Sequence, residues 1–290
     1  MSESGYYRSV ERGVRLPACP GYEACPAGEH AYNIDGYSMA ESLLPGMPVP
    51  VWSWRALTAC ISDLAAVGAA PVAAGYSIGV SSVEQAWQAW YGFTMASRYY
   101  GVETLKSDTN RSARDGEWID VYCTGRLAGS PAPNTPPPGR YTVIQAGYAG
   151  YGALERRLLE KRGGVPATLR LLEKRKISPD LWRLTGECGV AAAVDNSDGY
   201  LYTLETLARR GRITIILEEP PLLDPRLEGI IEAGEALGSW EDYNLFILAS
   251  GESVECVLGE ASRHGIPARI IGKTAPSRRG GLVRLLFEKF

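Results

Sequence analysis

The chain has 290 residues, of which 45% are apolar and 22% are charged, and its formal net charge is −3. These values are typical of a soluble globular protein, and they give no electrostatic reason to expect binding to nucleic acid or to an anionic membrane. The polar segment Met1–Arg12 lacks the apolar core of a secretory signal peptide, so we expect a cytoplasmic protein.

The weakly polar stretch Ala56–Val80 contains Asp63 and Pro71, and it therefore predicts a helix followed by a strand, not a membrane span. Six cysteines are scattered without the framework of a secreted disulfide-rich domain, so free cytosolic thiols are the default expectation. Cys19, Cys25 and His30 match no common zinc pattern. Scarce Gln and Asn hint at a thermophile, in which a Cys19–Cys25 disulfide is conceivable.

The first half of the chain alternates between strand and helix patterns. The predicted strands are 30–36, 71–80, 102–110 and 118–125, and the predicted helices are 52–68 and 82–100. Asp35 and Asp108 lie at or near strand ends, whereas Asp63 lies within an apolar helix, where it must reach water or a cation. We expect Trp87, Trp90 and Phe93 to belong to the core.

A Pro-rich segment, residues 130–139, predicts a stiff linker between an N-terminal domain (1–129) and a C-terminal α/β domain (140–290). The predicted strands of the second half are 141–146, 191–195, 213–217, 245–250, 268–272 and 282–286, and the helices are 152–161, one beginning at 169–176, 200–210, 225–237 and 252–264. The glycine-rich turn 147–152 is only weak evidence of phosphate binding. Gly272-Lys-Thr274 is not a P-loop, because Pro267 stands where the first glycine is required.

The most informative stretch is a small apolar run that ends at Asp195-Asn-Ser197-Asp198-Gly199 and continues as a helix with a basic last turn. Two carboxylates at this turn can attract a divalent metal, and the Ser197 hydroxyl and the first helical amides can hold phosphate oxygens. Alternatively, Ser197 or Asp198 only caps the helix. Because strand-end acids recur in both halves, we favour a site that gathers them around Mg²⁺ and a nucleotide.

Several motifs together resemble a known family. Ser62-Asp63-Leu-Ala-Ala-Val-Gly68-Ala-Ala-Pro71 is similar to the SD-x-AA-x-GA-x-P helix of thiamine-monophosphate kinases and of their relatives, aminoimidazole ribonucleotide synthase, selenophosphate synthetase and the hydrogenase-maturation carbamoyl dehydratase. Asp195–Gly199 resembles the D-x-SDG turn of that family, and Glu241–Leu245 its EDYEL segment. Ser107–Arg111 resembles the GGDT turn, and Ile34-Asp35 the TD strand end. Together, the SD-x-AA-x-GA, D-x-SDG and EDYEL motifs point to the kinase branch.

The resemblance implies an α/β (α+β) fold with the two-domain aminoimidazole ribonucleotide synthase-like architecture, whose N-terminal domain pairs with its copy in a homodimer. It implies an ATP- and Mg²⁺-dependent kinase that converts thiamine phosphate to thiamine diphosphate, with ATP and a small phosphorylated acceptor as partners. The implied roles are metal ligands (Glu23, Asp35, Asp63, Asp108, Asp195 and Asp198), of which Asp63 and Asp198 are catalytic, contacts to ATP (Ser107, Thr109 and Ser197) and a substrate contact (Glu241).

The sequence also departs from the family pattern. Gly21-Tyr22-Glu23 replaces an early G-D-D, Lys106-Ser107 replaces a glycine pair, and Asn134 is the nearest match to an arginine expected after the first domain. These departures leave the metal–nucleotide residues largely intact and weaken the case for thiamine monophosphate itself. Two alternatives therefore stay open: an ATP-dependent enzyme with a different small acceptor, for which selenophosphate-type chemistry would need Cys19 or Cys25 as a reactive thiol, and a non-catalytic nucleotide- or metabolite-binding protein.

Overall fold

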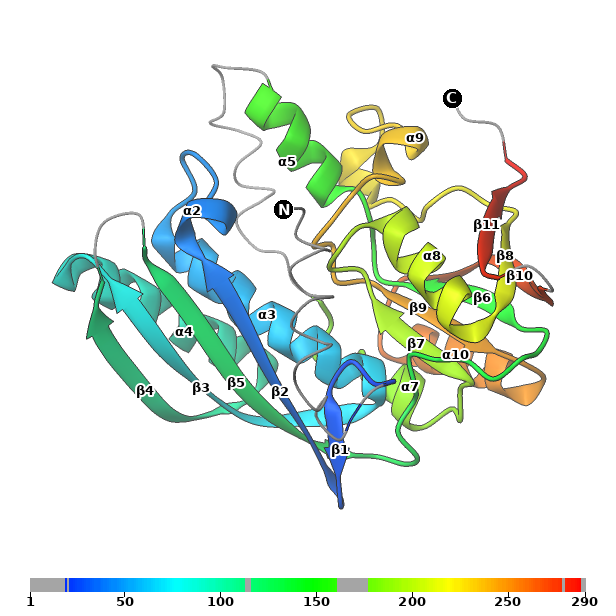
Figure 1. Ribbon diagram of the computed structural model, residues 1–290, viewed down its shortest axis with the longest axis horizontal. Coiled ribbons are helices and arrows are strands. Elements are labelled where there is room, and N and C mark those ends of the chain that lie inside the picture. Colours follow the sequence, from blue (N-terminus) through cyan, green and yellow to red (C-terminus); the bar gives the residue numbers. More distant parts are fainter. Residues whose placement is uncertain (1–18, 20, 113–115, 161–176, 278–279, 288–290) are drawn as a thin grey trace.

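The computed structural model describes residues 19, 21–112, 116–160, 177–277 and 280–287. Two β-sheets organise these residues, one in each half of the chain, and helices pack against both sheets (Figure 1). The fold is thus mixed α/β, as predicted. The helix expected at 169–176 lies outside the described residues.

The first sheet is antiparallel except for one parallel pair, β3 with β4, at its edge. Helices α3 (Val49–Val67) and α4 (Val83–Tyr100) cover one face, and no described helix covers the opposite face (Figure 1). In sheet order the strands are β1 (Cys25–Ala27), β2 (His30–Ser38), β5 (Trp118–Leu127), β3 (Ala69–Val80) and β4 (Glu103–Arg111).

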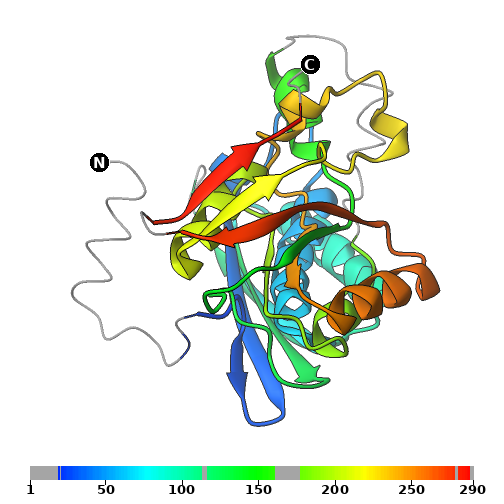
Figure 2. The same ribbon diagram turned by 90° about the vertical axis from the view of Figure 1, so that its right-hand side faces the viewer.

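The second sheet has six strands, and β11 and β8 form its parallel pair. In sheet order the strands are β11 (Leu282–Leu285), β8 (Ile213–Leu217), β10 (Ala268–Pro276), β6 (Thr142–Ala146), β9 (Leu245–Ala249) and β7 (Ala192–Asp195). Helix α8 (Tyr200–Gly211) packs against β8 and β11, and α10 (Glu252–Arg263) against β10 (Figure 2). The other helices are α2 (Met39–Ser42), α5 (Tyr151–Glu160), α7 (Arg183–Gly186), η1 (Pro225–Leu227) and α9 (Ala233–Ala236).

Helix α3 joins the two halves. Prolines in and before its first turn favour a start at Val49, and Gly68, with a φ of 82°, ends it in a left-handed conformation that suits glycine. The helix contacts β2, β3 and β5 on one side and β7 and α7 on the other, so most of its side chains are buried. A single apolar cluster accordingly extends from the first half into β9 and α10. An acid on α3 therefore lies where the two halves meet.

Most predicted elements are present, with two differences. The expected helix over 225–237 is reduced to the short η1 and α9, with an intervening turn at Gly229, whose φ is 72°. Phe93 is buried as expected, but Trp87 and Trp90 lie on the exposed side of α4, where they pack edge to face against each other. No helix in the described part of the chain is long and apolar enough to span a membrane.

The expectation of free thiols is wrong for this structure, because all six cysteines are paired. Cys19–Cys25 closes a short loop before β1, Cys60–Cys123 joins α3 to β5, and Cys188–Cys256 ties the segment before β7 to α10. Intracellular proteins of hyperthermophiles often contain disulfides, so the pairing is compatible with the thermophile expected from composition. With both Cys19 and Cys25 in a disulfide, neither is the free thiol that selenophosphate-type chemistry would need.

Candidate functional site

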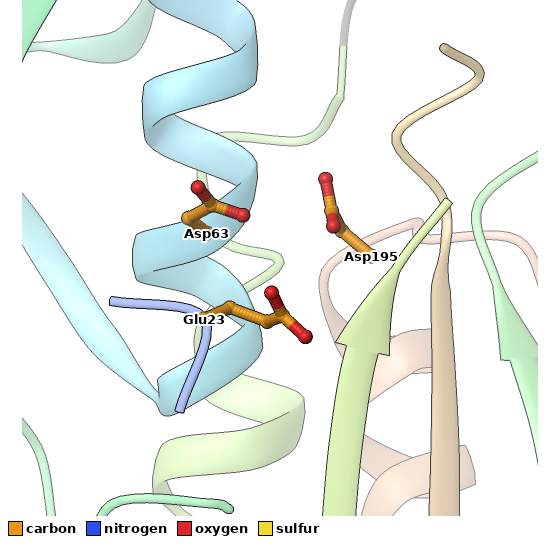
Figure 3. A group of neighbouring side chains, drawn as sticks. All are labelled: Glu23, Asp63 and Asp195. Carbon is orange, nitrogen blue, oxygen red and sulfur yellow. The ribbon is translucent and has the colours of Figure 1, made fainter. Parts of the chain in front are cut away.

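Three carboxylates from distant parts of the chain meet between α3 and the end of β7. Asp63 projects from α3, Asp195 is the last residue of β7, and Glu23 comes from the loop before β1 (Figure 3). One oxygen of each side chain lies within 4.8 Å of the others. Such spacing suits a shared cation with oxygen ligands, and Mg²⁺ prefers those ligands.

Hydrogen bonds hold two of these carboxylates in place. Ser62 Oγ on α3 donates to Asp195 Oδ2 at 2.6 Å, and this bond links the two halves of the protein. Asn33 Nδ2 on β2 donates to Asp63 Oδ2 at 2.5 Å. Sequence reasoning missed Asn33, although it lies two residues before Asp35 and a strand places such positions on one face.

The electrostatic environment disfavours three negative charges without a cation. Burial is the main cause that raises the pKa of Asp195 to about 8, and Glu23 adds to the increase. The pKa of Asp63 is also raised well above its ordinary value, first by burial and then by Asp195, Asp35 and Glu23. Burial raises the pKa of Glu23 as well. Since a cation would reverse these penalties, the donor set fits a divalent metal ion.

A cavity of about 550 Å³ adjoins the cluster and is lined by Glu23, Asp35, Asp63, Ser197, Asp198 and Glu241, among others. The pKa of Asp35 is raised to about 6, chiefly by burial and in part by Asp198 and Asp120. Thus five of the predicted site acids and Ser197 share one cavity, and its described lining includes no lysine or arginine. The negative charge of the cavity would favour cations, and a polyanion would bind there only together with a cation.

The acidic turn is more than a helix cap. Helix α8 begins after Gly199, and neither Ser197 nor Asp198 makes a side-chain capping bond to it. Asp198 is exposed in the cavity, and Ser197 Oγ donates to Asp195 Oδ1 at 3.3 Å. The capping alternative is therefore wrong for both residues, and their side chains remain accessible for ligands.

The Glu241–Leu245 motif lies directly against this turn. The amide of Glu241 donates to the Ser197 carbonyl at 2.8 Å, and the amide of Tyr243 donates to the Asn196 carbonyl at 3.1 Å. Glu241 and Tyr243 have positive φ values of 50° and 56°, a conformation that is uncommon outside glycine. Such backbone conformations persist only where the surroundings hold them, and they often occur at functional sites.

A buried arginine provides part of that support. Arg55 on α3 is only 2% exposed, forms an ion pair with Glu241 and lies 3.8 Å from Glu155 of α5. The hydroxyls of Tyr37 and Tyr243 hydrogen bond beside it. Sequence reasoning missed Arg55, although an arginine within so apolar a helix must pair with an acid when buried.

Other predicted residues lie elsewhere. Ser107, Asp108 and Thr109 are on β4, the exposed edge strand of the first sheet. Asp108 Oδ2 accepts hydrogen bonds from Asn110 Nδ2 at 2.9 Å and from Ser77 Oγ at 3.4 Å. None of the three lines the described cavity beside Asp63. Their roles toward ATP and metal therefore stay predictions.

The glycine-rich turn before α5 is already occupied. Asp242 accepts hydrogen bonds from the Gly150 amide at 2.9 Å and from the Gly152 amide at 3.1 Å. A buried carboxylate thus takes the positions that a phosphate would use at this helix N-terminus. The turn serves to anchor the Glu241–Leu245 segment.

Known proteins share this sequence pattern and this fold. Residues 30–127 match the family model described as AIR synthase related protein, N-terminal domain. A thiamine-monophosphate kinase of Corynebacterium glutamicum is 29% identical over 244 residues, which cover 79% of this chain and 71% of that relative. The structure of AaThiL complexed with AMPPCP and TMP has a TM-score of 0.81 at 20% identity, covering 99% of this chain and 94% of that one. A structure of thiamine-monophosphate kinase from Aquifex aeolicus has a TM-score of 0.78 at 20% identity, with 99% and 97% covered.

Proposed function

Because residues 30–127 match the AIR synthase related N-terminal domain and the chain resembles thiamine-monophosphate kinases over most of its length, we propose that it is an ATP- and Mg²⁺-dependent kinase of the same kind. The reaction transfers the γ-phosphoryl group of ATP to the phosphate of thiamine monophosphate and yields thiamine diphosphate and ADP. It takes place in the cytoplasm.

One observation carries the proposal: acids from both halves of the chain converge on a single cavity. Glu23, Asp63 and Asp195 form the closest group, and Asp35 and Asp198 line the same space. The raised pKa values of Asp63 and Asp195 mark a site that needs positive charge. These residues would hold Mg²⁺, which neutralises the charge of the phosphates when it is bound.

Ser197 and Glu241, which line the same cavity, bind and orient the substrates. Ser197 presents its hydroxyl beside Asp195 and is suited to a phosphate oxygen. Glu241, which pairs with Arg55, also lines the cavity and is suited to the cationic thiazolium ring of the acceptor. Because the acceptor is itself a phosphate, the reaction needs positioning and charge neutralisation but no strong base.

The uncovered face of the first sheet supports the proposed homodimer. Tyr32 and Ile34 of β2 and Tyr122 of β5 are exposed there, and Ile34, opposite Tyr122 in the register, is 73% exposed. Adjacent exposed apolar side chains on a sheet indicate a contact surface. Ile34→Lys should shift the protein to monomer in sedimentation velocity, whereas an unchanged dimer would exclude this face.

A coupled ADP-release assay tests the kinase. We expect ADP release that requires both thiamine monophosphate and Mg²⁺, and formation of thiamine diphosphate by chromatography. ATP binding without turnover of this or other small phosphates would identify a binding protein instead. Calorimetry that detects no ATP binding in the presence of Mg²⁺ would exclude both functions.

A further inference from the structure

Glu23 is the only member of the three-carboxylate cluster that comes from a loop, and a disulfide and two hydrogen bonds hold that loop. Asp63 lies on α3 and Asp195 on β7, so the backbone of each is set by regular structure. Glu23 lies between Cys19 and Cys25, whose disulfide closes the loop immediately before β1. A closed loop has fewer conformations than an open one, so it presents its side chains with less entropic cost.

Asn134, in the segment that connects the two sheets, holds the same loop at two points. Its backbone N–H donates to the Gly21 carbonyl at 2.7 Å, and its side-chain Nδ2 donates to Glu23 Oε1 at 3.0 Å. Asn134 is buried, so these bonds form away from competing water. Gly21 has a φ of 106°, a conformation that suits glycine and that turns the loop toward Asn134.

Arg210, in the last turn of α8, adds a positive charge beside Glu23. Its Nη1 lies 3.6 Å from Glu23 Oε1, the oxygen that Asn134 also contacts. A carboxylate can thus be held through Oε1 while Oε2 ligates a cation. Supporting contacts of this kind orient metal ligands, and their loss typically lowers metal affinity about 10- to 100-fold.

We propose that Asn134, Arg210 and the Cys19–Cys25 disulfide are positioning elements that preorganise Glu23 as a metal ligand. The proposal rests on the metal site of the proposed function, and it adds that the affinity of this site is set by a loop outside both sheets. Gly21-Tyr22-Glu23 stands where the resemblance has two acids, G-D-D, so a single longer carboxylate must reach the cluster. These elements would hold that carboxylate in place.

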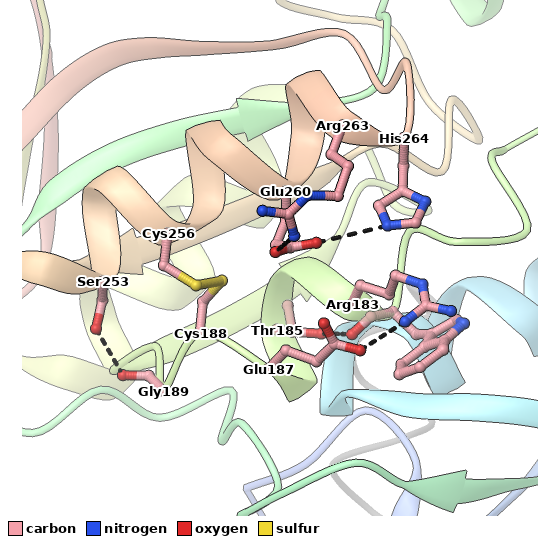
Figure 4. Close-up of a disulfide and its surroundings, with 11 residues drawn as sticks. Arg183, Thr185, Glu187, Cys188, Gly189, Ser253, Cys256, Glu260, Arg263 and His264 are labelled. Carbon is pink, nitrogen blue, oxygen red and sulfur yellow. Dashed lines mark hydrogen bonds and ion pairs between the residues drawn. A yellow bond between two sulfur atoms is a disulfide. The ribbon is translucent and has the colours of Figure 1, made fainter.

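Removal of the disulfide gives the first test. The double substitution Cys19→Ser/Cys25→Ser should weaken Mg²⁺ binding to the metal-free protein about tenfold in calorimetry. The control is Cys188→Ser/Cys256→Ser, which removes a disulfide between α10 and the segment before β7 that does not line the cavity (Figure 4). The control should lower Tm but leave Mg²⁺ affinity within about twofold of the wild type.

Asn134 and Arg210 give the second test, with no change at any cysteine. Asn134→Leu, which keeps the branching of the side chain but removes its hydrogen-bond donor, and Arg210→Gln should each weaken Mg²⁺ binding about tenfold. Arg209→Gln is the matched control, because Arg209 bonds to Thr206 on the exposed side of α8. It removes the same charge and should change the affinity less than about twofold.

The outcomes separate this proposal from the proposed function. If the wild type binds Mg²⁺ and the three test variants bind it as well as the wild type does, the positioning role is excluded and the kinase assignment stands. If the test and control variants lose affinity equally, the effect is one of general stability, and the positioning role is again excluded. A wild-type protein that binds no Mg²⁺ overturns the proposed function and this inference with it.

Discussion

Asp195 and Asp108 have similar sequence surroundings and very different environments. Asp195 ends an apolar strand, is 4% exposed and meets Asp63 and Glu23 at the junction of the two halves. Asp108 also lies in a strand but is exposed on β4 and bonds to Ser77 and Asn110. The carboxylate cluster around Asp195 is assembled by the fold of one chain. Asp108 lies on an exposed edge strand and does not line the cavity beside Asp63.

The sheet register explains the difference. Ser77 of β3 is opposite both Asp108 and Asp120, and Asp120 is opposite Gly36 of β2. This row alternates with Asn33, Asp35 and Tyr37 along β2, which face α3, and it belongs to the uncovered face that carries Ile34. Asp108 would therefore lie beside the proposed dimer contact, away from the buried cluster.

Substitution within the cluster should have the largest effect. Asp63→Asn removes a ligand charge while it keeps the side-chain size, so we expect activity to fall about 10²- to 10³-fold and Mg²⁺ binding to weaken strongly. Thermal unfolding of the metal-free variant should occur at a higher temperature than that of the wild type, because the cost of burying this carboxylate and its repulsion with the neighbouring acids are both relieved. A variant with normal Mg²⁺ affinity would contradict the role of Asp63.

Asp198→Asn should separate function from stability more cleanly. Asp198 is exposed in the cavity and does not cap α8, so its replacement should leave Tm within a few degrees of the wild type while kcat falls about 100-fold. Turnover assays and scanning calorimetry on the same preparation provide the measurement. A large loss of Tm without metal would show instead that the turn depends on this side chain for folding.

Sequence reasoning predicted the members of the cluster better than their supports. Periodicity located α3 and β7, and the motifs identified Asp63, Asp195 and Asp198 because their spacing is local. Arg55, Asn33 and the bonds of Asn134 were missed, since each depends on a partner far along the chain. The distance of Asp108 from the cluster could not be foreseen either, because it depends on the order β2-β5-β3-β4. Single-sequence patterns do not determine strand order.

Arg55 tests the support of the site through stability. Arg55→Met leaves Glu155 and Glu241 without their buried guanidinium, so the free energy of unfolding should fall by about 3–5 kcal/mol. Arg126→Met is the matched control, because Arg126 pairs with Glu29 on an exposed surface, where a pair contributes about 0–1 kcal/mol. Urea unfolding of both variants measures the difference. Equal losses would mean that Arg55 contributes no more than a surface ion pair.

The pH dependence of stability should distinguish the cluster from exposed acids. The folded-state pKa of Asp195 is about 8, above its ordinary value of 3.8, so the metal-free folded protein holds a proton that the unfolded chain releases. This contribution is therefore greatest at low pH and is lost as pH rises toward 8. We expect Tm in EDTA to fall by a few degrees between about pH 6 and about pH 8.5. Bound Mg²⁺ should remove most of that slope, and Asp195→Asn should reduce it but not abolish it, because the pKa of Asp63 is raised as well. A Tm that rises over this range without metal would contradict it.

Asp108→Asn should have the smallest effect in the absence of nucleotide. Its carboxylate is bonded on the exposed face of the first sheet and does not line the cavity beside Asp63, so Mg²⁺ affinity of the metal-free protein should stay within about twofold of the wild type. If ATP recruits this strand as the resemblance implies, the same variant should bind the Mg²⁺ complex of a non-hydrolysable ATP analogue about tenfold more weakly. Loss of affinity for Mg²⁺ alone would place Asp108 within the preformed site, and unchanged affinity in both titrations would make it a surface acid. Only an effect confined to the nucleotide complex would establish that the protein holds one group of acids ready and completes the other when ATP binds.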